Sequence, residues 1–138
     1  MPREPIEYLE HITEESELVG RVVDGLTFEQ FARDRVLIRA VERSLELIGH
    51  SAKLLPEDMR DGHPHVPWRQ IFGMRNRLAH DYLATDLDIV WAAATQGVPE
   101  VAEAVRLMTL EWAGQAEQPR WGQPDTPPEA DDERDESE

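Results

Sequence analysis

A chain of 138 residues has the length of one domain, and it can bury a hydrophobic core without disulfides. It contains no cysteine, which excludes disulfide and thiolate chemistry. The formal net charge of −15 excludes a broadly basic surface for nucleic acid, so any RNA contact has to be local.

The acidic charge is divided between two parts of different composition. Residues 1–114 carry twenty acidic and twelve basic residues, and residues 115–138 carry nine and two. The second part is rich in proline and nearly free of large apolar residues, which is typical of disorder. We predict a helical domain over 1–114 and a disordered acidic tail over 115–138. The tail is expected to solubilise the protein, although it could also imitate RNA and compete for arginines.

Membrane and secretion signals are missing from the sequence. No run approaches the roughly 20 apolar residues of a membrane-spanning helix. The first seven residues lack the apolar stretch of a signal peptide. We therefore expect a cytoplasmic protein without membrane contact.

The first half of the chain predicts two helices. The first is expected over about residues 4–23. Thr27 and Gln30 have the spacing of a capping box, which predicts the start of a long helix that ends near Leu55. A sustained apolar stripe along that helix predicts that one side faces the core. Residues 56–67, which contain three prolines and a glycine, predict a loop.

The second half predicts three more helices. Pro67 fits the first turn of a helix that carries Trp68 to about His80. A capped short helix is expected over 85–95, a break at 97–99, and a last helix over about 101–112. No segment shows sustained strand alternation. The fold class is therefore all-α, an antiparallel bundle of about four to five helices.

Residues 75–82, at the end of the third long helix, combine groups that suit phosphate chemistry. Arg75 and Arg77 offer planar forks of donors for phosphate oxygens, and Arg69 lies nearby as a third phosphate-binding candidate. His80 can pass a proton in either direction near neutral pH. Tyr82 adds a hydroxyl that can bond a ligand or be modified. None of these groups needs a metal.

The spacing of these residues constrains how they can act together. Asn76 and His80 are four apart and share one helix face, with Arg69 and Gly73 on nearly the same stripe. Arg75 and His80 are five apart, which is about 140° around an ideal helix. One straight helix would not direct both at one phosphate. Either the last turn unwinds, or a second copy completes the site across a two-fold axis.

Other polar residues have plainer interpretations. Residues 75–82, the polar octet, could themselves be a solvated face with a capped end. His63 and His65 could suggest a metal, but no further ligands follow at a recognisable spacing. Asp86 and Asp88 fit a helix cap better than a metal site. We therefore predict no metal.

Residues 66–82 resemble the signature of HepT-like toxins, which belong to the HEPN superfamily. The family motif is Arg, four residues, His, any residue and Tyr, usually with Asn after the Arg. Arg75, Asn76, His80 and Tyr82 occupy these places. Similarity extends to 39–49 and to 91–108, so that the resemblance covers about residues 5–113.

The resemblance implies an all-α homodimer with the motif at a cleft between protomers, and metal-independent endoribonuclease activity. Arg75 would hold and stabilise the scissile phosphate. His80 would be the general acid or base for attack by the ribose 2′-hydroxyl, which leaves a cyclic phosphate end. Asn76 would position His80 or the phosphate.

The resemblance also implies a partner. Family members are encoded beside an MntA-like minimal nucleotidyltransferase antitoxin that transfers AMP from ATP to the motif tyrosine, here Tyr82. The added phosphates would repel the RNA backbone. The toxin itself would need no cofactor, because only the antitoxin uses ATP. One departure is His50, where the family usually has an acid; it could be a surface residue or a second phosphate ligand.

Two other functions compete with the ribonuclease. The chain could be a non-catalytic HEPN module that binds nucleotide or docks a nucleotidyltransferase, and the acidic body, which weakens RNA affinity at long range, keeps this alternative open. The presence of both Arg75 and His80 favours the enzyme. A purely structural dimerisation bundle leaves the polar octet unexplained.

Overall fold

The computed structural model describes residues 3–80 and 86–116, and within these ranges the chain is helical and contains no strand. The predicted all-α fold is confirmed. In the same ranges, no helix combines the length and apolar character needed to cross a bilayer. The elements in chain order are α1 Pro5–Val23, α2 Phe28–Arg33, α3 Arg35–Leu54, α4 Glu57–Asp61, α5 Trp68–His80, α6 Leu87–Ala92, the π-helical turn η2 Ala93–Gly97 and α7 Val98–Ala116.

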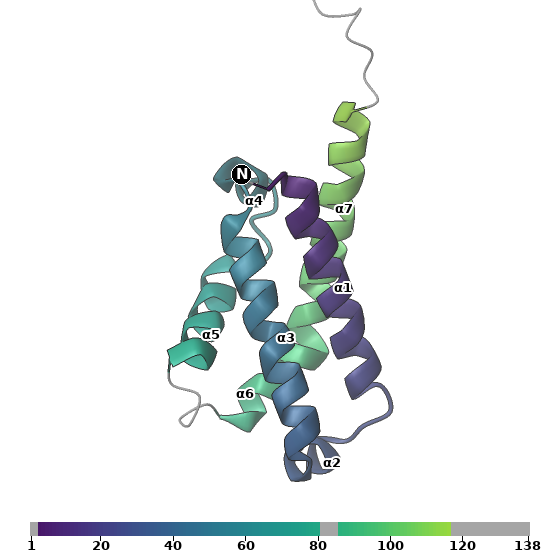
Figure 1. The fold of residues 1–138 in the computed structure, drawn as a ribbon, viewed down its shortest axis with the longest axis vertical. Coiled ribbons are helices and arrows are strands. Elements are labelled where there is room, and N and C mark those ends of the chain that lie inside the picture. The colour runs from purple at the N-terminus through teal and green to yellow at the C-terminus, as the bar shows by residue number, and fades with distance from the viewer. Residues whose placement is uncertain (1–2, 81–85, 117–138) are drawn as a thin grey trace, which may run out of the picture.

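Four long helices form the bundle, with α3 at its centre (Figure 1). Helix α3 packs against α1 on one side and α5 on the other, while α7 packs against α1. Their apolar faces meet in one core, and each large side chain buried there contributes about 1.5–3 kcal/mol. The core residues of these helices with almost no exposed surface include Leu9, Ile12, Val41, Ile48, Val101, Val105 and Met108.

The prediction of one long helix from Thr27 to Leu55 is wrong in one respect, because the helix is interrupted at Asp34 and forms α2 and α3. The capping box itself is present, since the Thr27 hydroxyl accepts from Gln30 N at 3.2 Å. Asp34, however, has extended backbone angles of φ −110° and ψ 101°. Its carboxylate caps α3 by accepting from the N–H groups two and three residues further on, at 3.0 and 3.3 Å. The break places Phe31 in the core beside Trp91, with ring centroids 5.1 Å apart.

Two connections also differ from the prediction. The loop expected over 56–67 contains the short helix α4. The break expected at 97–99 is absent, because η2 joins α6 directly to α7, and Pro99 fits the first turn of α7.

Asp86 caps α6 as expected, with Oδ1 accepting from Asp88 N at 2.9 Å. Helix α7 runs to Ala116, and the predicted disordered tail lies, from residue 117 on, outside the described residues.

Candidate functional site

Helix α5 is a cationic element in an acidic protein. Between Trp68 and His80 it carries three arginines and one histidine and no aspartate or glutamate. None of the three arginines forms a salt bridge with a carboxylate among the described residues. The absence of neutralising carboxylates leaves these guanidinium groups available to an anionic ligand.

Arg106 on α7 shows the contrasting situation. Its guanidinium donates to both carboxylate oxygens of Glu103, at 2.7 and 3.0 Å. This hydrogen bonding holds the pKa of the Glu103 carboxyl below its usual value. Arg106 is therefore already paired on the surface, whereas the α5 arginines have no carboxylate partner among residues 3–80 and 86–116.

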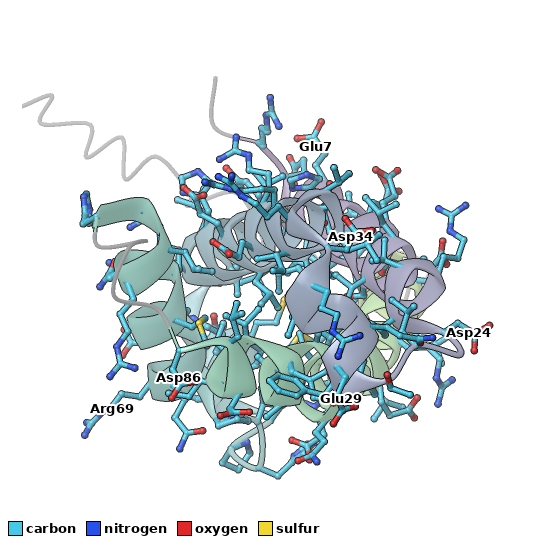
Figure 2. The ribbon with its side chains drawn as sticks, turned by 90° about the horizontal axis from the view of Figure 1, so that it is seen from below. Glu7, Asp24, Glu29, Asp34, Arg69 and Asp86 are labelled. Carbon is cyan, nitrogen blue, oxygen red and sulfur yellow. The ribbon has the colours of Figure 1, made fainter. Side chains whose placement is uncertain are left out.

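The predicted faces of α5 are confirmed. The outward face is exposed, and Figure 2 shows Arg69 pointing from α5 away from the bundle. The inward face packs on the core, with Leu78 buried and Ile71 and Met74 partly buried. The exposed residues at the predicted spacing are Arg69, Gly73, Asn76 and His80.

Gly49 of α3 allows a close approach between α3 and α5. A Cβ atom at this buried position would lie 2.5 Å from Arg75 Cβ and 3.1 Å from Arg75 Cγ. The carbonyl oxygen of Ile71 would be only 3.3 Å away. Only glycine permits this separation of the two helices. The base of the Arg75 side chain is therefore fixed by direct packing on the α3 backbone.

The Arg75 guanidinium is oriented but not fully satisfied. Its Nη1 donates to Asn76 Oδ1 at 3.1 Å. Its Nε is buried and has no hydrogen-bond partner within the described residues. Leaving a buried donor unpaired costs about 1–3 kcal/mol. Because Nε has essentially no exposed surface, an anionic ligand would meet the half-buried Arg75 side chain at its terminal nitrogens.

The remaining residues predicted for the site are His80, Tyr82 and His50, of which His80 and His50 form no hydrogen bond with Arg75 in the described part of the chain. The structure brings Arg75 and Asn76 together, but no hydrogen bond joins exposed His80 to either of them in the described part of the chain. Tyr82 lies outside the described residues. His50 is exposed and directly follows Gly49, so it lies on the α3 surface.

The histidines of the 56–67 segment are arranged differently from a metal site. His63 is buried, with Nε2 3.4 Å from Glu111 Oε1 of α7. The ring of His65 is centred 5.9 Å from that of His63. Across residues 3–80 and 86–116, no three His, Cys, Asp or Glu side chains gather as potential metal ligands.

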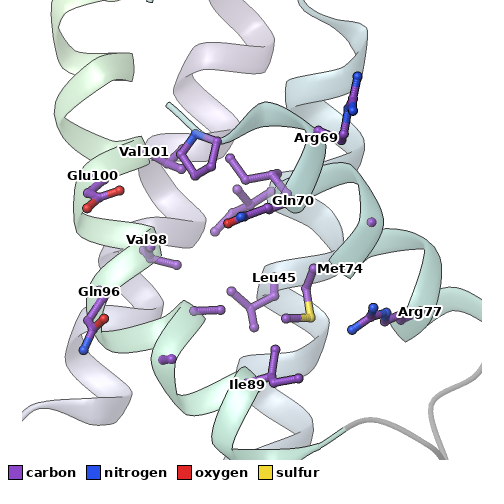
Figure 3. A pocket seen from close by; sticks show the side chains of 17 residues that line it. Leu45, Arg69, Gln70, Met74, Arg77, Ile89, Gln96, Val98, Glu100 and Val101 are labelled. Carbon is purple, nitrogen blue, oxygen red and sulfur yellow. The ribbon is translucent and has the colours of Figure 1, made fainter. Parts of the chain in front are cut away.

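Sequence reasoning missed two features of the site. One is the role of Gly49, although a glycine inside a long helix signals a packing requirement because it costs about 0.5–1 kcal/mol relative to alanine. The other is a groove along α5 that contains Arg69 and Arg77 (Figure 3). Its lining comes from segments far apart in the sequence, so no local pattern indicates it.

Replacement by alanine is expected to have opposite effects on stability at the two helical glycines beside the site, Gly49 and Gly73. Gly49→Ala should destabilise the protein by about 1–3 kcal/mol, because the new methyl group overlaps Arg75. Gly73→Ala should be neutral or stabilising by up to about 1 kcal/mol, because a Cβ there meets no atom within 4 Å. Chemical denaturation of both variants measures the difference. Equal stabilities would contradict the close contact between α3 and α5.

Comparison with known proteins identifies relatives over most of the helical bundle. A family model described as "Ribonuclease HepT-like" matches residues 9–108. A protein of Caldanaerobacter subterraneus subsp. tengcongensis, named as a candidate RNase, is 43% identical over 102 residues, or 74% of this chain and 91% of that protein. A Thermococcus cleftensis protein named "Probable ribonuclease HepT" is 36% identical over 101 residues, or 73% and 92% of the two chains.

No solved structure gives a significant match. The family match includes the whole of α3 and α5, and therefore the Gly49–Arg75 contact and the exposed face with Asn76 and His80. These matches confirm the resemblance that the motif indicated, and the chain belongs to the HepT-like ribonuclease family.

Proposed function

We propose that this protein is a metal-independent endoribonuclease whose active site contains Arg75 and His80. The observation that carries the proposal is the Arg75 side chain, whose stem is packed on α3 and whose guanidinium is oriented by its hydrogen bond to Asn76. A phosphate oxygen is the acceptor that this fork fits best. The family to which the chain belongs supports RNA as the source of that phosphate.

The proposed reaction is transfer of the phosphate to the neighbouring ribose 2′-hydroxyl. A histidine removes the proton from the 2′-hydroxyl, whose oxygen then bonds to phosphorus while the bond to the 5′-oxygen breaks. The leaving oxygen receives a proton, so that the products carry a 2′,3′-cyclic phosphate and a 5′-hydroxyl. Arg75 stabilises the charge that develops on the phosphate oxygens. Asn76 keeps the guanidinium oriented through its 3.1 Å hydrogen bond.

The proposed active unit is a homodimer. Arg75 and His80 diverge on α5, so Arg75 of one protomer would act with His80 of the partner subunit. The outward face of α5 supports this arrangement because Arg69, Asn76 and His80 are exposed, and Gly73 presents no side chain to an approaching backbone. A two-fold axis on this face would create two equivalent sites, each with Arg75 from one protomer and His80 from the partner subunit.

The proposed biological role is that of a toxin in a toxin–antitoxin pair. The HepT-like family supports a cognate MntA-like nucleotidyltransferase as antitoxin, which would neutralise the toxin by transferring AMP to Tyr82. The negative charge would then lie two residues after His80 in the chain, where it would oppose binding of the RNA backbone. Only protein that does not carry AMP on Tyr82 would cleave RNA.

A non-catalytic module is the second candidate. The net charge of −15 opposes RNA binding at long range, and this favours a protein that binds nucleotide or docks the nucleotidyltransferase without cutting RNA. The two candidates differ in whether purified protein cleaves RNA.

Substitution of the two proposed catalytic residues tests the ribonuclease. Arg75→Ala and His80→Ala should each lower kcat by at least about 100-fold, because each removes stabilisation of the transition state or proton transfer. Cleavage is measured on single-stranded RNA with chelator present, and the ends of the products are analysed for cyclic phosphate.

The matched control is Arg43→Ala, because Arg43 is an exposed arginine of α3 paired with Glu46 at 3.3 Å. It should cleave at nearly the wild-type rate. If wild-type protein and both α5 variants have equal activity, Arg75 and His80 do not carry the reaction. If purified protein does not cleave RNA, the non-catalytic module becomes the better account.

The proposed dimer is tested at Gly73. Gly73→Glu should give a monomer without ribonuclease activity, because the new charge is added to the face that the partner would cover. Light scattering after size exclusion gives the mass, and circular dichroism checks that the helices persist. Gly114→Glu, at an exposed position near the end of α7, is the control that should remain dimeric and active. A dimeric and fully active Gly73→Glu variant would contradict this interface.

Modification of Tyr82 is tested by co-expression with the cognate nucleotidyltransferase. Intact mass should increase by whole AMP units, and ribonuclease activity should fall with the modified fraction. Tyr82→Phe should abolish the addition, whereas Tyr8→Phe, a partly buried tyrosine of α1, should be modified like wild type. Addition of AMP to Tyr82→Phe would place the modification elsewhere.

A further inference from the structure

A groove of about 610 Å³ runs between α5 and the segment formed by α6, η2 and the start of α7 (Figure 3). Leu45 and Ile48 of α3 contribute to its floor. Its volume lies within the range of about 300–1,000 Å³ that is typical of sites for small ligands. It lies along the same helix that carries Arg75 and His80.

The groove combines an aliphatic floor with a few polar groups. Figure 3 shows the Arg77 guanidinium directed over the groove, beside Met74 and Ile89, and Gln70 across its middle. Gln96 of η2 also lines the groove, and Figure 3 shows its exposed side chain at the edge opposite Arg77. Neither amide makes a hydrogen bond within the described residues. Each therefore offers both donors and an acceptor to a ligand.

We propose that this groove binds one base of the RNA next to the scissile phosphate and so determines the sequence preference of cleavage. The proposal rests on the ribonuclease function proposed above. A base has apolar faces that pack on aliphatic side chains and polar edges that amides can read. Gln70 and Gln96 would contact the base edges, and Arg77 would bind its phosphate.

The arrangement of α5 connects the groove to the proposed cleavage site. Arg77 comes two residues after Arg75, which places it about 160° away around the helix. An RNA strand that crosses α5 would therefore have one phosphate at Arg75 and a neighbouring nucleotide at the groove. The bases of single-stranded RNA can be splayed out in this way and bound separately.

The charges favour RNA over a peptide as the occupant. Helix α5 has no carboxylate, and its arginines make no salt bridge in the described part of the chain. The lining does include Glu100 of α7, which Figure 3 shows on the side of the groove opposite Arg77. In the proposed dimer the partner subunit covers only the Arg69 and Gly73 edge of the groove. An apolar helix seated over Arg77, Gln70 and Gln96 would bury these polar groups without supplying phosphate or base acceptors. Burying such polar groups unpaired is unfavourable.

The experiment compares cleavage patterns on an RNA pool with a randomised tract, using the full-length protein. Wild type should prefer one base at a fixed position beside the cut. Gln96→Ala should reduce that preference by about tenfold, as expected for loss of a hydrogen bond that reads the base. Ala92→Trp, at an exposed position that lines the groove, should lower kcat/KM by at least tenfold by filling it. Ala113→Trp, an exposed position near the end of α7, is the matched control and should behave as wild type.

Binding separates this proposal from the ribonuclease itself. The probe is a pool of uncleavable 2′-O-methyl RNA octamers, measured by fluorescence anisotropy. The groove proposal is supported if binding shows a base preference that Ala92→Trp removes and Ala113→Trp retains. This result counts even if wild-type protein cuts no RNA and the proposed function fails. The groove proposal is overturned if Gln96→Ala and Ala92→Trp both cleave RNA at the wild-type rate and bind it with the wild-type base preference. The proposed ribonuclease function is unaffected by that result. If Ala92→Trp changes only the oligomeric state or antitoxin binding, the groove is a protein interface and the proposal is also overturned.

Discussion

The contact between Gly49 and Arg75 is the constraint on which the arrangement of the site depends. It brings α3 and α5 close enough that a Cβ would lie 2.5 Å from the arginine side chain. This packing fixes the stem of Arg75, and the hydrogen bond to Asn76 orients its guanidinium. Helix packing therefore holds the Arg75 guanidinium in one orientation, in which an anion can bind its terminal nitrogens.

The local positive charge of α5 explains how an acidic protein could bind RNA. Long-range attraction is weak for a chain of net charge −15, so affinity has to come from short-range contacts. Helix α5 supplies these with arginines that have no carboxylate neighbours on their own helix, whereas Arg106 is paired with Glu103. Such a site would select substrate by close fit more than by electrostatic steering. The groove beside Arg77 would contribute to that fit.

The sequence predicted the helical class and the faces of α5, because periodic apolar residues determine which side of a helix is buried. It did not predict the break at Asp34, where an acid within an apolar stripe caps a new helix instead of continuing the old one. Nor did it predict the π-helical η2, because the glycine and proline that predicted a break are accommodated at the junction with α7. For the site, the motif located Arg75 and His80, but the role of Gly49 and the groove depends on tertiary contacts. The position of Tyr82 stays a prediction.

The most direct test of the central claim is complementation between two inactive variants. Arg75→Ala and His80→Ala proteins are unfolded together, refolded at equal concentration and assayed for RNA cleavage. If each site takes Arg75 from one protomer and His80 from the partner subunit, half of the dimers are mixed and one of their two sites is intact. Activity should then recover to about one quarter of the wild-type value. Recovery no greater than the sum of the two separate variants would contradict a site shared between protomers.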